Sequence, residues 1–295
     1  MKIKYRRYYV YYLLKILFFF MSFIPLKVSL AMADFFGKAG FAFIRKYREI
    51  AISNLDEVFS DDHEANVKIA RKVFSNFAKN GAEWIKLYSM KPEDLDDIVT
   101  ENEGLEYLDS VLAEGKGALV LGFHFGNWEL LGVYLRRKGY PGKLVGRRIY
   151  FHKYDKFITR MRHRFDAKVI YRDESPRKML KVLKDGSILG IVPDQDVESV
   201  DGVFVDFFGK PAFTPVAPVK LAMAARTKIV PVFVVRKKDD THKLVVEKPI
   251  DVTAGSGTEE DVKKYTQAWT GLLEKYVREY PEQWVWVHRR WKTQK

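Results

Sequence analysis

The pattern of apolar and polar positions divides the chain into a helical first part and a longer part in which strands and helices alternate. Residues 34–58 have the spacing of one or two amphipathic helices, and residues 61–88 have that of a long helix capped by Asp61 or Asp62. Apolar runs with the length of strands follow at 118–123, 143–145, 168–171, 187–192, 203–207, 229–235 and 243–246. Stretches with helical spacing lie around them, at 105–113, 128–137, 154–164, 177–184, 216–225 and 258–279.

This alternation predicts an α/β fold with a mixed, mostly parallel sheet flanked by helices. A chain of 295 residues can bury one sizeable core, and we find no internal repeat or low-complexity tract in it. We therefore expect residues 34–295 to form a single α/β domain with a helical N-terminal part. Residues 1–33 are expected to form an N-terminal membrane helix.

The N-terminal segment is aromatic and begins with the basic residues Lys2, Lys4, Arg6 and Arg7. Its longest uncharged run, 16–26, is shorter than the about 20 residues that a membrane span needs. Lys15 and Lys27 flank this run, and Pro25 would kink a helix there. Three interpretations stay open: a helix that embeds in or spans the membrane, a signal peptide cleaved after 31–33, and a buried helix of a soluble protein. We expect the first, because tyrosine and phenylalanine suit a membrane interface.

Composition narrows the possible partners and chemistry. The chain has no cysteine, which excludes disulfides, cysteine metal sites and a thiol nucleophile. Its net charge of +13 suits nucleic acid, an anionic membrane or an acidic substrate. Because no nucleic-acid-binding module is recognisable and the N-terminal segment favours lipid, we predict no nucleic-acid partner.

One histidine stands at a place suited to catalysis. The apolar run 118–121 predicts a buried strand, Gly126 and Asn127 interrupt it, and a helix is predicted from residue 128. His124 therefore lies where a strand gives way to a helix, and Glu129 follows in the first helical turn. A neutral histidine there can take a proton from a hydroxyl, and a carboxylate can hold its ring. The spacing alone also fits a histidine that merely caps a helix.

Several longer strings carry a family resemblance. They are 48–55, Gly-Phe-His-Phe-Gly-Asn-Trp-Glu at 122–129, Val-Pro-Asp-Gln-Asp at 192–196, Phe-Val-Asp-Phe-Phe-Gly at 204–209, and the tryptophan-rich tail at 281–292. Together they resemble the late acyltransferases of lipid A biosynthesis, the lauroyl and myristoyl transferases. Those enzymes are a branch of the glycerolipid and lysophospholipid acyltransferases with a His-x4-Asp/Glu motif, and mannoside acyltransferases are their relatives.

The resemblance implies an activity and its surroundings. Such enzymes move a fatty acyl group from acyl carrier protein to a hydroxyl of a Kdo-bearing lipid A precursor, at the cytoplasmic face of the bacterial inner membrane. The expected partners are therefore acyl carrier protein, a phosphorylated glycolipid acceptor and the bilayer. This chemistry requires no metal and no other cofactor.

Four residues are expected to be catalytic. His124 would act as general base, with Glu129 fixing its ring and stabilising the imidazolium. The resemblance implies an essential arginine, and Arg162 matches it best by its spacing to Asp194. Asp194 itself would orient the base or an arginine, although a turn aspartate without a role is the alternative.

Further residues are expected to bind substrate. They are Gly126 and Asn127 through their N–H groups, the basic residues Arg147, Arg160, Arg164, His288, Arg289 and Arg290 through phosphates, and Phe208 in a loop at the acyl entrance. For Gly126 the alternative is a turn that needs glycine, and for the arginines it is a solvated basic face. For residues 288–290 it is a docked tail, and for Phe208 it is core packing. Trp284, Trp286 and Trp291 suit an amphipathic strand or an interfacial anchor. His63, His152, His163 and His242 are expected on the surface.

Three alternative functions remain, of which one is a membrane-binding protein without catalytic activity. The acceptor could be another glycolipid or a lysolipid, acylated from acyl-CoA or acyl carrier protein, because residues 197–202 and Trp291 depart from the better-known members. Outside the family, Asp194 and Asp196 form an Asp-x-Asp string like that of metal-dependent glycosyltransferases.

Overall fold

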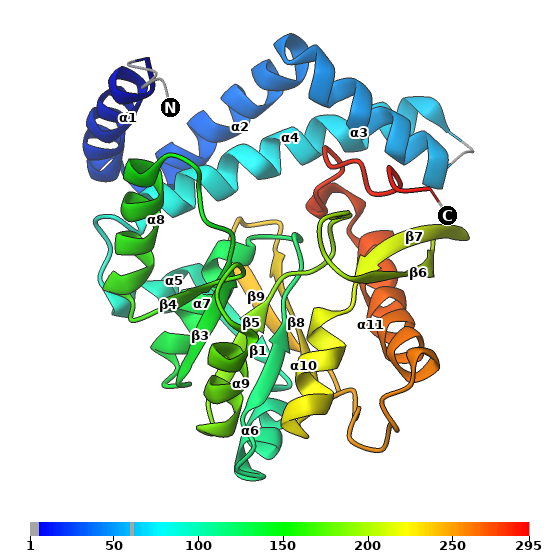
Figure 1. The fold of residues 1–295 in the computed structure, drawn as a ribbon. Helices are drawn as coiled ribbons and strands as arrows, with labels where there is room; N and C mark the ends of the chain where they lie inside the picture. Colours follow the sequence, from blue (N-terminus) through cyan, green and yellow to red (C-terminus); the bar gives the residue numbers. More distant parts are fainter. Residues whose placement is uncertain (1–5, 60–61, 295) are drawn as a thin grey trace.

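A seven-stranded sheet forms the centre of the computed structural model, which describes residues 6–59 and 62–294, with side chains from residue 8 onward (Figure 1). The basic side chains predicted at the start of the chain, Lys295 and the candidate cap Asp61 lie outside the described residues. Its strands are β1 (Val99–Glu103), β2 (Ala118–Leu121), β3 (Gly142–Gly146), β4 (Lys168–Tyr171), β5 (Ile188–Ile191), β8 (Ile229–Arg236) and β9 (His242–Val246). The remaining strands, β6 (Gly202–Phe207) and β7 (Lys210–Pro215), pair only with each other.

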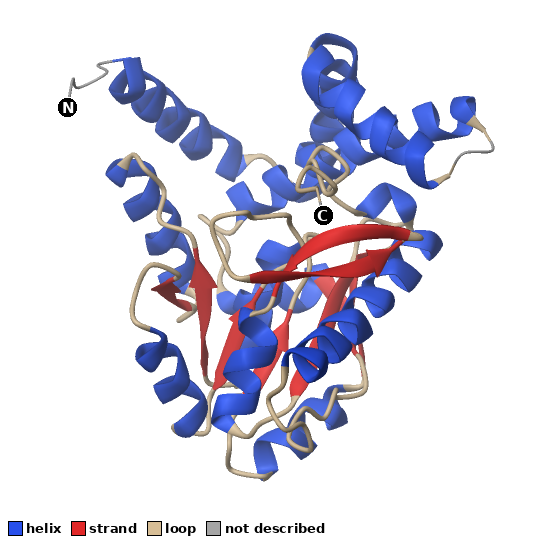
Figure 2. Ribbon diagram, turned by 45° about the vertical axis from the view of Figure 1, so that its right-hand side comes forward, coloured by secondary structure: helices blue, strands red, loops and turns tan. Residues whose placement is uncertain are grey.

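The sheet is mixed and mostly parallel, as predicted. Its strand order is β1-β9-β8-β2-β5-β3-β4, and only the β8–β9 pair is antiparallel. Helices cover both faces of it (Figure 2). They are α5 (Leu95–Ile98), α6 (Leu105–Ala113), α7 (Trp128–Arg137), α8 (His152–Arg164), α9 (Pro176–Lys184), α10 (Ala217–Ala225) and α11 (Glu259–Glu279), with short 3₁₀ turns η1 (Pro92–Asp94) and η2 (Pro281–Gln283).

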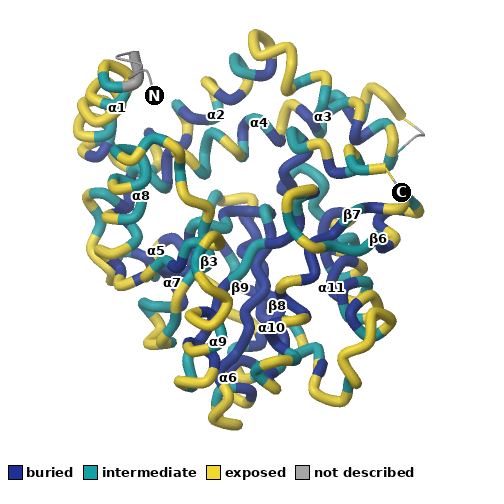
Figure 3. Tube along the Cα trace, viewed as in Figure 1, coloured by how far each residue is buried: buried dark blue, intermediate teal, exposed yellow. Residues whose placement is uncertain are grey.

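Strand β2 shows why the sheet is buried on both sides. Its four residues are all apolar and all buried. Because successive side chains of a strand point to opposite faces, Leu119 and Leu121 join a core with Trp269 of α11, whereas Ala118 and Val120 join one with Leu130 of α7. The dark band through the centre of Figure 3 is this doubly covered sheet.

Two strands, β1 and β7, were not predicted from the sequence pattern. β1 has the sequence Val-Thr-Glu-Asn-Glu, and only its first residue is buried, so no apolar run marks it. It exists because it pairs with β9 at the edge of the sheet. β7 carries Pro211 and Pro215 and was expected as a loop, but it pairs antiparallel with β6. The hairpin tolerates proline because β7 has no second strand neighbour.

Four helices precede the sheet: α1 (Arg6–Phe23), α2 (Leu26–Phe43), α3 (Arg45–Val58) and α4 (His63–Lys86). Pro25 separates α1 from α2, and Asp62 caps α4 by accepting a hydrogen bond from the N–H of Ala65. Residues Gly37 and Ser75 mark the close packing of α2 on α4, since a Cβ on Gly37 would lie 2.6 Å from the Cα of Ser75.

Large apolar side chains stay exposed on α1 and α2. They include Tyr9, Leu13, Ile16, Phe20, Phe23, Phe35 and Phe36. Among the helices of the described ranges, none has the length and hydropathy that passage through a bilayer requires. Membrane association of residues 1–33 and the division at residue 34 therefore stay predictions, and residue 34 lies inside α2.

Candidate active site

His124 and Asp194 meet at the carboxyl edge of the parallel strands. His124 follows β2 and Asp194 follows β5, and these neighbouring strands run parallel, so the segments after them leave the sheet at one edge. The Nδ1 atom of His124 lies 2.7 Å from Oδ1 of Asp194, and the backbone N–H of His124 donates to both carboxylate oxygens at 3.1 Å. The orienting role predicted for Asp194 requires such a contact with the histidine or an arginine, and the contact is with His124.

The ring of His124 has one free nitrogen. Because an ionised carboxylate only accepts hydrogen bonds, Nδ1 carries the hydrogen and Nε2 is the basic nitrogen. No partner within the described residues contacts Nε2, and the side chain of His124 is 22% exposed while that of Asp194 is fully buried. Trp128 packs its ring edge-on against the imidazole, with 5.2 Å between ring centroids. This arrangement leaves an oriented imidazole whose second nitrogen has no hydrogen-bond partner within the described residues.

Charges around the pair set its protonation. Burial lowers the pKa of His124, but the carboxylate of Asp194, with a smaller contribution from Glu129, raises it above the ordinary value. Burial raises the pKa of Asp194, but His124 and the indole N–H of Trp284 outweigh it and hold this pKa below the ordinary value. Asp194 is thus held ionised against the imidazole.

Glu129 does not hold the ring, which corrects our expectation. Its carboxylate forms an ion pair with Arg162, whose Nη2 lies 2.9 Å from each carboxylate oxygen. Both side chains are about one quarter exposed, Arg162 at 23% and Glu129 at 28%. Glu129 therefore acts on His124 through its charge, and Arg162 is brought to the site through Glu129.

The predicted oxyanion donors are occupied. The N–H of Gly126 donates to the carbonyl of Gln283 at 2.9 Å, and that of Asn127 donates to the carbonyl of Val234 at 3.3 Å. Gly126 has φ +54°, and a Cβ there would lie 1.7 Å from the Val234 oxygen. The prediction that these N–H groups face a substrate is wrong, and glycine is needed here by the turn.

The other predicted substrate contacts divide into two groups. Arg147, Arg160 and Arg289 are exposed, so their binding to phosphates stays a prediction. Arg164 instead donates to the carbonyls of Tyr88 and Met90, and Arg290 is buried and donates to the Phe213 carbonyl and the Thr214 hydroxyl. Nε2 of His288 accepts the backbone N–H of Asp196. These last three side chains fasten the protein to itself, which the sequence pattern could not show.

Phe208 and the tryptophans are core residues. Phe208 is 8% exposed, occupies the turn of the β6–β7 hairpin and packs against Phe207. Trp284 and Trp286 are almost fully buried, so the predicted acyl entrance at Phe208 and the predicted interfacial anchoring by these two tryptophans are wrong. The nitrogen of Trp284 donates to Oδ2 of Asp194 at 3.0 Å, a contact that makes this tail residue part of the site.

A second buried cluster lies behind the His124 loop and was missed. Glu83 of α4 accepts two hydrogen bonds from Arg236 and one from Asn127, and lies 3.0 Å from Nε2 of His242. All four residues are buried, which corrects the expected surface position of His242. Asn80, also on α4, donates to the carbonyl of Gly126. The signal for Glu83 was its place on the buried stripe of α4, and for Arg236 its place at the end of an apolar strand.

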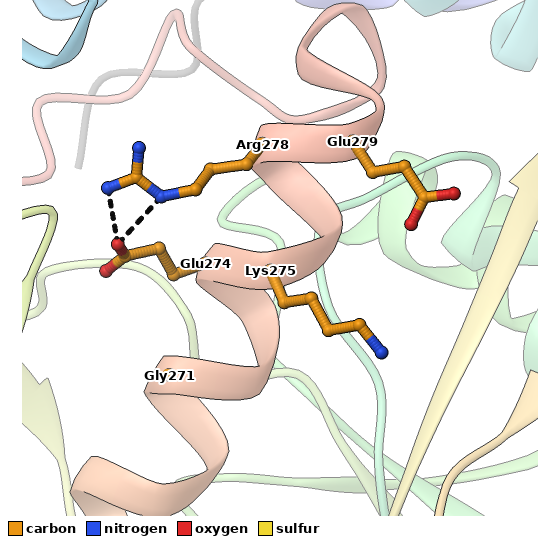
Figure 4. Close-up of a pocket in the computed structure, with 5 residues that line it drawn as sticks. All are labelled: Gly271, Glu274, Lys275, Arg278 and Glu279. Carbon is orange, nitrogen blue, oxygen red and sulfur yellow. Dashed lines mark hydrogen bonds and ion pairs between the residues drawn. The ribbon is translucent and has the colours of Figure 1, made fainter.

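In the part of the chain that the structure describes, no three His, Cys, Asp or Glu side chains come together as a metal site. A surface pocket of about 670 Å³ lies on α11. Its lining residues are Gly271, Glu274, Lys275, Arg278 and Glu279 (Figure 4). Four of its five lining residues are charged and the pocket is open to solvent, so it lacks the apolar enclosure that an acyl chain requires.

The sequence of this chain is similar to those of known proteins. The sequence model of the family described as bacterial lipid A biosynthesis acyltransferase matches residues 1–293. The lipid A biosynthesis lauroyltransferase of Escherichia coli is 28% identical over 92% of this chain and 87% of its own length. The lipid A biosynthesis acyltransferase of Haemophilus influenzae is 27% identical over 65% of this chain and 59% of its own. The phosphatidylinositol mannoside acyltransferase of Mycobacterium tuberculosis is 28% identical over 64% and 58%.

Proposed function

Because the chain belongs to the family of bacterial lipid A biosynthesis acyltransferases, we propose that it moves a fatty acyl group from acyl carrier protein to a hydroxyl of a Kdo-bearing lipid A precursor. Membership makes the chain an acyltransferase of that family; the donor, the acceptor and the mechanism are our proposal. The observation that carries the mechanism is the His124–Asp194 pair, in which the imidazole side chain is 22% exposed and Nε2 has no hydrogen-bond partner within the described residues.

The proposed reaction is a direct transfer. Nε2 of His124 takes the proton of the acceptor hydroxyl while the hydroxyl oxygen attacks the thioester carbonyl. The tetrahedral intermediate then expels the thiolate, and the imidazolium gives its proton to that thiolate. An ester C–O bond forms as the C–S bond breaks. The buried carboxylate of Asp194 stabilises the imidazolium that exists between these steps. A base positioned in this way contributes typically about 10²–10⁴-fold.

Positive charge near the site supports a phosphorylated acceptor. Arg162 is brought to the site by Glu129, and one of its N–H edges can hold a phosphate or the developing oxyanion. The exposed Arg147 follows β3 at the same carboxyl edge of the sheet as His124. Because the N–H groups of Gly126 and Asn127 are occupied, and that of Leu130 donates to the carbonyl of Asn127 at 3.1 Å, the backbone candidates for the oxyanion at the start of α7 are the N–H groups of Trp128 and Glu129.

The N-terminal helices support a membrane location, which we propose to be the cytoplasmic face of the bacterial inner membrane. Exposed aromatic and aliphatic side chains of α1 and α2 would face lipid, and the net charge of +13 would favour an anionic surface. The same charge would attract an acidic acyl carrier protein and a phosphorylated acceptor. The proposed transfer needs no cofactor.

One alternative acceptor has specific support. A relative of this chain is named a phosphatidylinositol mannoside acyltransferase, so another glycolipid, acylated from acyl-CoA or acyl carrier protein, is the second candidate. The glycosyltransferase alternative is disfavoured by the contacts of its two aspartates. Asp194 is engaged by His124 and Trp284, and Asp196 accepts two hydrogen bonds from Thr293.

The test is a transfer assay with matched variants. Purified protein is incubated with radiolabelled acyl-carrier-protein and acyl-CoA thioesters, and with Kdo-lipid A precursor or phosphatidylinositol mannoside as acceptor. We expect transfer from the carrier protein to the lipid A precursor, a loss of about 10²–10⁴-fold in His124→Ala, and normal transfer in His63→Ala, an exposed histidine control. Normal turnover by His124→Ala refutes the mechanism. Transfer to the mannoside alone refutes the proposed acceptor. Transfer that a chelator abolishes refutes the proposed metal-free reaction.

A further inference from the structure

Residues 283–293 of the C-terminal tail lie against the catalytic loops. Phe125 and Trp284 form an antiparallel bridge, and the carbonyl of Gln283 accepts the N–H of Gly126. Asn54 of α3 donates to the carbonyls of Trp286 and His288, which fixes the tail from the other side. The tail is therefore held on both sides where it passes the site.

Trp284 places a donor on the carboxylate that serves His124. Oδ1 of Asp194 lies 2.7 Å from Nδ1 of the imidazole, and Oδ2 accepts the indole N–H of Trp284 at 3.0 Å. The indole is 1% exposed and packs edge-on against Phe207 and Trp286, with ring centroids 5.4 and 4.8 Å apart. A carboxylate fully removed from water depends on such donors for its orientation and its charge.

We propose that Trp284 is a positioning residue of the acyl-transfer site, whose indole N–H orients the carboxylate of Asp194 toward His124. This inference rests on the proposed function. Other titratable groups surround the His124–Asp194 pair. Glu129 is one of them and is paired with Arg162. The others are His288 and Arg290 of the tail, and Asp196. None of these charged side chains donates to Oδ2 of Asp194 within the described residues. The other donor to Oδ2 there is the backbone N–H of His124, at 3.1 Å, and Oδ1 shares that N–H at the same distance, so the indole is the side-chain donor that belongs to Oδ2 alone.

Replacing Trp284 by phenylalanine tests the donor while keeping a buried ring. Trp286→Phe is the matched control, because Trp286 is equally buried but donates its indole N–H to the carbonyl of Pro281. We expect kcat of Trp284→Phe to fall about tenfold or more with KM within about twofold, since the lost hydrogen bond goes to a charged group. Trp286→Phe should keep both constants.

The pH profile separates positioning from packing. Without the indole, the carboxylate charge is less compensated and the pair binds its proton more tightly, so the acidic limb of kcat/KM should move to higher pH in Trp284→Phe and not in Trp286→Phe. Equal kcat and equal limbs in the two variants, whatever their thermal stability, overturn the proposal.

A measurement without turnover keeps this inference distinct from the proposed function. NMR titration of the His124 imidazole should show its pKa raised further in Trp284→Phe, even if no tested thioester is a substrate. If the variant does not fold, the wild-type indole N–H signal of Trp284 should titrate with the same midpoint as His124, because both bind one carboxylate. An indole signal that ignores His124 overturns the proposal.

Discussion

The molecule contains two buried carboxylate–histidine pairs that differ in what surrounds them. Asp194 and His124 lie 2.7 Å apart, and Glu83 and His242 lie 3.0 Å apart. The side chain of His124 is 22% exposed, whereas His242 is fully enclosed. Glu83 is also neutralised by two hydrogen bonds from Arg236, whereas Asp194 has no such cation bonded to it within the described residues.

The difference shows what separates a reactive pair from a structural one. Both contain the same two chemical groups, but only His124 keeps a basic nitrogen that a substrate can reach. The Glu83 cluster instead fastens the loop beneath His124, because Glu83 binds Asn127 and the neighbouring Asn80 binds Gly126. Under the proposed function, the reactivity of the His124–Asp194 pair would follow from access and from an incompletely compensated charge.

The largest expected effect comes from exchanging each histidine for glutamine, which can still donate to the carboxylate. His124→Gln should lose about 10²–10⁴-fold in kcat, because the general base is gone. His242→Gln should keep most of its kcat, because it lies outside the reacting centre. Both are measured by labelled acyl transfer at saturating substrate. A larger loss in His242→Gln would overturn the comparison.

Removing the charge of the enclosed pair should affect stability most. Glu83→Gln leaves the guanidinium of Arg236 buried without its counter-charge, and we expect about 3–5 kcal/mol less free energy of unfolding. Urea denaturation measures it. Glu49→Gln, in the exposed pair with Arg45, is the control and should be indistinguishable from wild type.

Acid should reveal the same carboxylate. Burial raises the pKa of Glu83, but His242 and Arg236 outweigh it and lower this pKa from 4.5 to about 2. Because the folded value lies below the unfolded one, the stability gained is complete above pH 4.5 and is lost as the pH falls toward 2. Glu83→Gln should lack this part of the pH dependence in urea titrations; an unchanged acid slope would contradict the assignment.

The pKa of His124 is shifted in the opposite direction from that of Glu83. Asp194 raises the pKa of His124, so transfer should increase as the pH rises through a value above 6.5. In Asp194→Asn the acidic limb of kcat/KM should move to lower pH, with a lower plateau because the ring loses its orientation. A limb that stays in place would mean that another group titrates.

Glu129→Gln should produce the smallest shift. Its charge contributes least among the causes that raise the pKa of His124, so the acidic limb should move to lower pH by less than in Asp194→Asn. Freed from its partner, Arg162 should also alter KM for a phosphorylated acceptor. Glu49→Gln is again the matched control. A shift of the acidic limb larger than that of Asp194→Asn would mean that Glu129 is the main carboxylate partner of the His124 ring.

Local pattern predicted most of the fold. The helices at 105–113 and 128–137 have the predicted bounds, and the central strands coincide with apolar runs. β1 could not be predicted, because its polar side chains carry no signal and its stability comes from backbone pairing with β9. Proline similarly hid β7.

The site was predicted in its members more than in its contacts. Sequence spacing placed Glu129 nearest to His124, but the fold brings in Asp194 from 70 positions away. Trp284 is a further 90 positions from Asp194 along the chain. Such pairings depend on which strands lie side by side, and no local pattern contains that information.

Helix α4 connects parts of the molecule that are otherwise separate. Lys86 binds the carbonyls of Ser22 and Ile24 at the end of α1, Glu83 holds Asn127, and Asn76 donates to the carbonyl of Glu282 before the tail. Helix α4 thus sets the spacing of the N-terminal helices, the loop that contains His124 and the C-terminal tail. An engineer who wished to exchange the N-terminal helices would have to preserve the α4 face, because altering it would displace the reacting groups as well.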